Sequence, residues 1–287
     1  MWVAFALGSA FFAAITSILA KMGVKNINAN LATAIRTVVV LLFAWLMVFV
    51  TGAYHTLRLI AFDNILFLVL SGLSTGGSWI CYFKALQTGD INKVVPIDKF
   101  SVVLTMLLAF IFLGERVSWT GVAAMALIAA GTYLMIAFKK TDKNVIGKQW
   151  LIYALLSALF ASLQAILGKV GVAAMDSNLA TAIRTIVVLV MAWVIVLTQG
   201  KQKEIKNIDK KSGVFLVLSG LSTGLSWLCY YRALQDGPAS VVVPIDKLSI
   251  LAAVALSFVI FKERLTKKSA GGLALIVAGT LCLLLHR

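Results

Sequence analysis

Six ionisable residues lie inside long apolar stretches of the chain, where a charge has to be paired or serve a purpose. They are Arg36, Asp98, Lys99, Arg184, Asp246 and Lys247. Charges in an apolar phase are costly, and by default they mark functional pathways or buried ion pairs. Neighbouring residues of a helix point about 100° apart, so we do not expect either Asp to pair with the Lys beside it. We expect Arg36 to pair with Asp98, and Arg184 with Asp246, either as gates that open and close a passage or as contacts that only fix helix packing.

A proline precedes each of these carboxylates by two residues, Pro96 before Asp98 and Pro244 before Asp246. Proline is tolerated in the first turn of a helix and breaks its interior. We therefore expect a helix to start near each proline, with the Asp one turn inside, where the helix dipole favours a negative charge.

A stripe of hydroxyl and aromatic side chains recurs at helical steps of three and four, which places its members on one face. The stripe residues are Ser71, Thr75, Ser78, Tyr82 and the adjacent Trp79, with a second set at Ser219, Thr223, Ser226, Tyr230 and the adjacent Trp227. We expect some of these side chains to line a cavity that binds a small solute at mid-span. The candidates are Thr75, Ser78, Trp79, Tyr82, Thr223, Ser226, Trp227 and Tyr230. The alternative is helix packing alone, because glycines four residues apart (Gly72 and Gly76, Gly220 and Gly224) bring helices close together.

The composition identifies the phase in which these residues lie. Hydrophobic residues make up 61% of the 287 residues and charged residues 13%, whereas a soluble domain has roughly 25% charged residues. Lipid must therefore be the main solvent of this chain. The net charge of +15 lies mostly in short loops and indicates no nucleic-acid partner. The chain has no GxxxxGK[ST], HExxH or GxSxG motif, and its three cysteines lie in apolar stretches, so we expect no enzyme activity, no catalytic residues, no metal and no cofactor.

Ten stretches are apolar and about 20 residues long, the length that a membrane helix needs. Their approximate ranges are 2–20, 31–51, 64–86, 92–114, 119–138, 150–168, 179–198, 212–234, 240–262 and 268–286. The predicted fold class is all-α, a polytopic membrane protein with ten transmembrane helices.

The chain repeats itself at an offset of 148 residues. LATAIRT occurs at 31–37 and at 179–185, VVPIDK at 94–99 and at 242–247, and SGLSTGGSW at 71–79 returns as SGLSTGLSW at 219–227. We predict two five-helix repeats, residues 1–138 and 149–287, joined by a linker over 139–148. Because five is odd, the second repeat must be inverted in the membrane, an arrangement found in secondary transporters that work by alternating access. One chain then supplies a pseudo-dimer, so we expect a monomer.

Loop charges predict the orientation. Loops on the side of the linker hold seventeen basic residues against five on the other side, and the contrast is clearest between residues 201–211, with five Lys, and residues 53–63, with one Arg. The positive-inside rule puts the linker in the cytoplasm and both termini outside.

Motifs in both halves resemble the EamA-type ten-helix members of the drug/metabolite transporter superfamily. They are Arg36 and Arg184, the stretches CYFKALQTG…VVPIDKFS and CYYRALQDGPASVVVPIDKLS, the GER and KER sequences, and AGT in the last span of each half. The resemblance covers nearly the whole chain and implies a central cavity between the halves for amino acids, metabolites, nucleotide sugars or toxic compounds. The chain departs from the small multidrug-resistance branch, because Thr16 and Gln164 stand where that branch has a proton-coupling Glu, which argues against proton-coupled antiport of cationic drugs. We count Thr16 and Gln164 among the residues expected to line the cavity.

These observations favour a secondary transporter of small organic solutes in the cell membrane, with the lipid bilayer and a small-molecule substrate as its partners. Two alternatives remain: a membrane scaffold subunit that transports nothing, and a flippase for lipid-linked sugars. A polar cavity at mid-depth would separate transport from the scaffold, and a gap open to lipid would favour the flippase. Glu115 and its counterpart Glu263 lie at span ends, where we expect each only to start the next helix.

Overall fold

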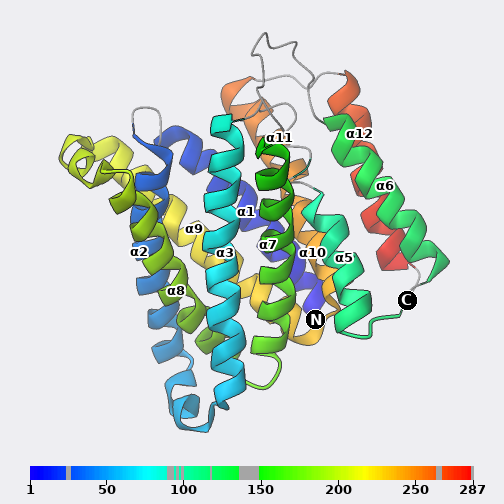
Figure 1. Cartoon of the computed structure of the whole chain (residues 1–287), viewed down its shortest axis with the longest axis horizontal. Coiled ribbons are helices and arrows are strands. Elements are labelled where there is room, and N and C mark those ends of the chain that lie inside the picture. Colours follow the sequence, from blue (N-terminus) through cyan, green and yellow to red (C-terminus); the bar gives the residue numbers. More distant parts are fainter. Residues whose placement is uncertain are drawn as a thin grey trace. The chain divides into compact units, whose positions relative to one another are not determined.

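Helices make up all the secondary structure of the part of the chain that the computed structural model describes (Figure 1). The described residues are 1–23, 27–88, 94, 97, 100–116, 118–135, 149–262 and 267–285. In the first half the helices are α1 (Trp2–Gly23), α2 (Ala29–Val50), η1 (Ala53–Leu59), α3 (Phe62–Thr88), α5 (Ser101–Phe112) and α6 (Trp119–Met135). In the second half they are α7 (Gln149–Val172), α8 (Ser177–Thr198), η2 (Lys201–Asn207), α9 (Lys210–Asp236), α10 (Ala239–Lys247), α11 (Ser249–Phe261) and α12 (Lys267–Leu285).

Seven helical segments within the described residues are long and apolar enough to cross a membrane, and three shorter helices are also apolar. The protein is therefore a multi-pass membrane protein. Ten crossings and the inversion of the repeats stay predictions.

Local side chains determine where several helices begin. The Asn28 side chain accepts hydrogen bonds from the first turn of α2, and Asp176, its repeat counterpart, does the same for α8. Asp209 caps α9, and the hydrogen bond from Ser212 lowers the pKa of this carboxyl. Such caps satisfy N–H groups that have no partner inside the helix. Helices α2 and α8 end before Gly52 and Gly200, whose positive φ angles of 72° and 65° suit glycine, and a short 3₁₀ helix that the sequence did not predict follows each one.

The span predicted over 240–262 corresponds to Ala239–Ile260, which is long and apolar enough to cross a membrane. It is divided into two helices, α10 and α11, which meet at Leu248, whose N–H bonds the carbonyl of Ile245 three residues back. Pro244 lies in the interior of α10 and cannot donate a backbone hydrogen bond, which weakens the helix just before this break. The same turn recurs in the first half, where the Phe100 N–H bonds the carbonyl of Ile97.

The described helices form two compact units, and each unit combines segments from both halves of the sequence. The first unit is Met1–Leu73, Leu167–Gly237 and Ser249–Glu263, and the second is Ser74–Ile166, Pro238–Leu248 and Arg264–Arg287. The repeat boundaries at 138 and 149 remain a prediction.

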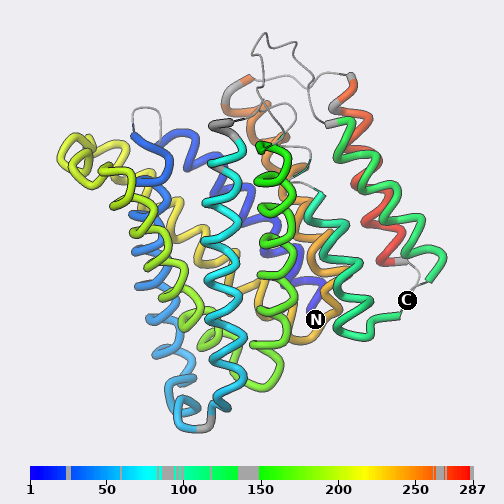
Figure 2. Tube along the Cα trace, viewed as in Figure 1, coloured from blue at the N-terminus to red at the C-terminus, as the bar shows by residue number. Residues whose placement is uncertain are grey.

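In the first unit, α1 packs along α9, and α2 packs against both α8 and α9 (Figure 2). Glycine allows the close approach of α2 to α9, because a Cβ at Gly220 would lie 2.7 Å from Val39 Cβ and 3.0 Å from the carbonyl of Arg36. Gly72, its repeat counterpart, meets Val187 on α8 in the same way, at 2.7 Å. Small residues here bring the backbones of membrane helices close together.

In the second unit, α6 packs against α12, and α10 against α5. A Cβ at Gly131 would lie 2.5 Å from the carbonyl of Gly272, and one at Gly279 would lie 2.8 Å from the carbonyl of Ala124. Both glycines therefore permit a backbone contact that no larger residue could make.

Candidate functional site

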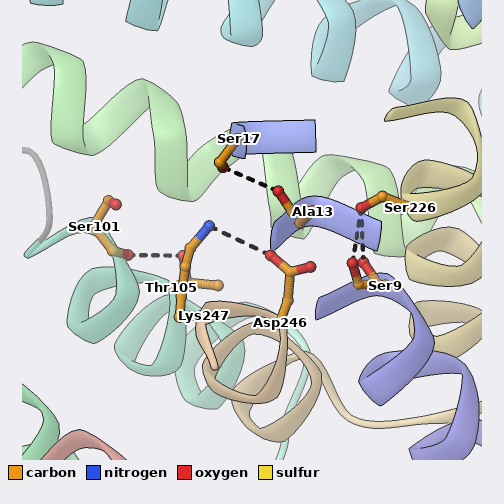
Figure 3. Close-up of polar contacts among 8 residues, drawn as sticks. All are labelled: Ser9, Ala13, Ser17, Ser101, Thr105, Ser226, Asp246 and Lys247. Atoms are coloured by element: carbon orange, nitrogen blue, oxygen red, sulfur yellow. Dashed lines mark hydrogen bonds and ion pairs between the residues drawn. The ribbon is translucent and has the colours of Figure 1, made fainter. Parts of the chain in front are cut away.

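Within the first unit, the hydroxyl stripe on α9 packs along α1. Ser219 donates to the carbonyl of Thr16 at 3.2 Å. Ser226 donates to the carbonyl of Ser9 at 3.1 Å, and the hydroxyls of Ser226 and Ser9 lie 3.3 Å apart (Figure 3). The Thr16 and Thr223 hydroxyls lie 3.4 Å apart. The buried hydroxyls of Ser219, Thr223 and Ser226 thus each have a partner on the neighbouring helix or on their own backbone.

Within the second unit, the equivalent stripe on α3 makes the equivalent contacts with α7. Thr75 donates to Gln164 Oε1 at 3.2 Å, where Thr223 meets Thr16 in the other copy. The hydroxyls of Ser78 and Ser157 are 3.3 Å apart, like those of Ser226 and Ser9. The predicted candidates Thr16 and Gln164 therefore do contact the stripe threonines.

These contacts show the packing role that the sequence left open for the stripe hydroxyls. Thr75 and Thr223 are 7% and 9% exposed, and water access to them stays a prediction. The stripe aromatics are less enclosed. Trp79 and Tyr230 are half-buried, and Tyr82 packs on a small cluster formed by Ala85, Val94 and Ala154.

Arg36 on α2 points its guanidinium at the α9 stripe. Its Nη2 donates to Thr223 Oγ1 at 2.9 Å, while its Nε is buried and has no hydrogen-bond partner among the described residues. A hydrogen bond from a charged donor is stronger than a neutral one. Arg36 is therefore held by one strong polar contact at the level of the stripe threonine.

Arg184 on α8 lies in a different setting. Only 3% of the residue is exposed, its Nε donates to Ser71 Oγ at 3.1 Å, and its Cζ lies 5.1 Å from the Trp227 ring centre and 5.2 Å from that of Tyr231. Cation–π contacts of this kind stabilise a desolvated guanidinium. Sequence reasoning selected Trp227 as a cavity residue but missed Tyr231, which is 1% exposed.

Asp246 and Lys247 form a pair, contrary to our expectation for adjacent residues. Lys247 Nζ lies 3.5 Å from Asp246 Oδ2 (Figure 3). The flexible lysine side chain reaches sideways across the angle between neighbouring positions. The expected place of Asp246 near a helix start is also wrong, because α10 begins at Ala239 and Asp246 lies in its last turn.

The remaining pairing predictions are not decided. Asp98, Lys99 and Pro96 lie outside the described residues. Arg184 and Asp246 belong to different compact units, so their pairing stays a prediction.

Sequence reasoning also interpreted Glu115 wrongly. It does not start the next helix, which begins at Trp119. Its carboxylate accepts hydrogen bonds from the backbone N–H of Ala239 at 2.6 Å, from that of Ser240 at 3.0 Å, and from the Ser240 hydroxyl. The sequence did contain a signal that the cap of α10 has to come from elsewhere, because Pro238 precedes α10 and has no side chain that could cap the helix.

A surface pocket of about 430 Å³ lies elsewhere in the first unit. Its lining residues are Thr56, Ile60, Ala173, Ala174, Met175, Asp176, Arg232 and Gln235. None of the predicted site residues is among them.

Both halves of the chain are similar to known proteins. The sequence model of the EamA-like transporter family matches this chain twice, at residues 1–137 and 148–285. A Sinorhizobium protein named as an uncharacterized transporter is 44% identical over 137 residues, which are 48% of this chain and 97% of that protein. An uncharacterized protein of Methanocaldococcus jannaschii is 34% identical over 98 residues, covering 34% of this chain and 69% of its own length.

A solved crystal structure matches the fold with a TM-score of 0.77 at 16% identity, over 99% of this chain and 96% of that one. At this identity the likeness concerns the fold alone. The two family matches cover nearly the whole chain, and they confirm the resemblance seen in the sequence motifs. The chain belongs to the EamA-like transporter family.

Proposed function

We propose that this protein is a secondary transporter that moves small organic solutes, such as amino acids, metabolites or drug-like compounds, across the cell membrane by alternating access. In this proposal residues 1–138 and 149–287 are two inverted five-helix repeats that together cross the membrane ten times. The linker over 139–148 is cytoplasmic, and both termini are outside.

Two findings support the repeat as the working unit. The family model matches each half separately. The Sinorhizobium relative is matched over 97% of its length by only 48% of this chain, so a protein about as long as one repeat exists on its own. Fusion of two such units would provide, in one chain, the two halves that alternating access needs.

The exchange of contacts between the repeats also supports this proposal. The first helix of the first repeat, α1, bonds α9 of the second repeat, and α7 of the second repeat bonds α3 of the first through equivalent residues. If the two repeats are related by a two-fold axis, every contact between them should recur with the repeats exchanged, as these contacts do.

The observation that carries the proposal is that the two equivalent arginines each bond the stripe of the opposite repeat. Arg36 Nη2 of the first repeat donates to Thr223 on α9, and Arg184 Nε of the second repeat donates to Ser71 on α3. Each repeat thus places a guanidinium against the polar face of the other, as expected where two inverted repeats share one passage.

Solute flux tests the proposal directly. Purified protein is screened by thermal shift against pooled amino acids and metabolites, because a ligand that binds only the folded state raises the melting temperature. Solutes that stabilise the protein are then assayed for counterflow in proteoliposomes. We expect saturable exchange of at least one of them, which Thr75→Val with Thr223→Val reduces. Stabilisation by no solute and no exchange of any would favour a scaffold subunit.

A fluorescent reporter that matures only in the cytoplasm tests the orientation. Fused after the C-terminus it should stay dark, whereas inserted in the 139–148 linker it should fluoresce. A bright C-terminal fusion of correctly folded protein would reverse the assignment.

A further inference from the structure

The start of α10 is held by a residue far away in the sequence. Other helices carry their own caps, Asn28 for α2 and Asp176 for α8, each adjacent to the helix that it caps. The N-cap of α10 is Pro238, which makes no side-chain cap. Its place is taken by the Glu115 carboxylate, 124 residues from Ala239, which binds two backbone N–H groups and one hydroxyl in the first turn.

The backbone before Glu115 directs its carboxylate to this place. Gly114 has a φ of 64°, and the Glu115 N–H bonds the carbonyl of Ala109, so the chain makes a tight left-handed turn at the end of α5. The counterpart of Gly114 is Lys262, which adopts a φ of 56° although it is not a glycine. The turn before Glu263 is thus kept in the second repeat against the preference of lysine for negative φ.

A distant cap differs physically from a local one. A local cap moves with its helix, whereas the contact between Glu115 and α10 has to break when α10 moves away from the α5–α6 connection. Helix α10 ends in the Asp246–Lys247 pair and is followed by the break at Leu248. The turn at Leu248 separates α10 from α11 along the chain, and both ends of α10 carry charge-assisted contacts.

We propose that Glu115 is a positioning residue for transport: its carboxylate latches the start of α10 in one state of the cycle, and its release lets α10 carry Asp246 and Lys247 to a new position. This inference rests on the proposed alternating access. The repeat counterpart of Glu115 is Glu263, and those of Ala239 and Ser240 are Ile91 and Asn92. At the position of Pro238 the first repeat has Asp90, a residue type that can cap a helix locally. These four residues of the comparison lie outside the described residues.

Labelling of a single cysteine tests the latch. Val242 on α10 is 0% exposed, so Val242→Cys, with the native cysteines replaced by alanine, should react slowly with a membrane-impermeant thiol reagent. We expect Glu115→Gln to raise the labelling rate from one face at least about threefold, because losing charge-assisted hydrogen bonds shifts a two-state equilibrium by this order. Glu263→Gln is the matched control and should not raise labelling from that same face. Equal rises in both variants, or no rise with Glu115→Gln, would overturn the proposal.

A second variant separates a latch from a simple helix cap. Pro238→Asp gives α10 the local cap residue that the first repeat has at position 90. In the double variant with Glu115→Gln, we expect the melting temperature to recover while labelling at position 242 stays high. Recovery of low labelling as well would show that Glu115 only caps the helix. If Glu115→Gln does not fold, Glu115→Asp serves instead, since its shorter side chain keeps the charge but cannot reach both N–H groups.

The labelling needs no known solute, so it can fail independently of the proposed function. Unchanged labelling in a protein that transports would remove the latch alone. Raised labelling in a protein that moves no solute would leave a mobile α10 and remove the transport proposal.

Discussion

Arg36 and Arg184 occupy the same position of the two repeats, within identical LATAIRT sequences, yet their surroundings differ. Arg184 is enclosed by Ser71, Trp227 and Tyr231, while Arg36 is half-buried, donates a hydrogen bond of 2.9 Å to Thr223 and leaves its Nε without a partner among the described residues. Local sequence therefore does not decide the environment of these guanidinium groups. The comparison suggests that Arg184 stabilises the structure seen here, and that Arg36 is the arginine more ready to exchange its partner.

The largest expected effect is on stability. Arg184→Gln should lower the free energy of unfolding by about 3 kcal/mol, because it removes a buried charged hydrogen bond and two cation–π contacts. Arg36→Gln should cost about 1 kcal/mol, since one charged hydrogen bond is lost while a partly desolvated charge is relieved. Denaturant titration in detergent measures both. Equal losses would mean that the two sites are energetically alike despite their contacts.

Measurements of transport extend the comparison to Asp246 and Asp98, the predicted partners of Arg184 and Arg36. Asp246→Asn and Asp98→Asn should each lower solute flux about tenfold, equivalent to roughly 1.4 kcal/mol, if the pairs act as gates. Melting temperatures should change little, because Asn keeps the shape and one acceptor oxygen. A stability loss of about 3–5 kcal/mol with normal flux per folded molecule would instead identify a buried pair that only fixes packing.

The partner of Arg36 can be removed without touching the arginine. Thr223→Val deletes the acceptor hydroxyl and should cost about 1–2 kcal/mol, because it leaves a buried guanidinium donor unsatisfied. The matched change in the other repeat is Thr75→Val, which removes the hydrogen bond that Thr75 donates to Gln164 Oε1 and should cost at least about 0.5–1 kcal/mol. Denaturant titration measures both variants, and an unchanged stability of Thr223→Val would contradict the assignment of Thr223 to Arg36.

The smallest expected effect concerns the aromatic enclosure of Arg184. Trp227→Phe keeps a ring but weakens the cation–π contact, and it should cost about 0.5–1 kcal/mol. Trp79→Phe, the equivalent change in the other repeat, is the control. Thermal unfolding of the two variants under identical conditions compares them, and a greater loss at position 79 would remove the enclosure as a source of stability.

Much of the architecture could be predicted from periodicity and composition. The predicted spans over 2–20, 31–51, 150–168 and 179–198 match α1, α2, α7 and α8 within a few residues, because long apolar runs with polar ends leave little choice for a chain in lipid. The break between α10 and α11 was missed, although Pro244 signalled it, since a proline near an expected helix start looked harmless. Both 3₁₀ helices were missed because short polar connections have no hydrophobic period.

The candidate site could be predicted only in part. Helical spacing identified the stripes and their threonines, and the structure then brought Thr16 to Thr223 and Gln164 to Thr75. Spacing along one helix cannot tell whether a polar face meets water or another helix, and here the hydroxyls meet another helix. The role of Glu115 depends on a contact across 124 residues, which no local pattern contains.

The sequence by itself determined that the chain is a helical membrane protein, that its two halves repeat at an offset of 148 residues, and which few side chains carry charge in apolar surroundings. These properties follow from composition and order, since transfer to lipid and backbone hydrogen bonding act on each segment alone. Only the tertiary structure decided that Arg184 lies against two aromatic rings and Arg36 against the Thr223 hydroxyl, and that Glu115 holds the start of α10. The physical reason is that partners distant in sequence provide these contacts, so two identical heptapeptides meet different neighbours.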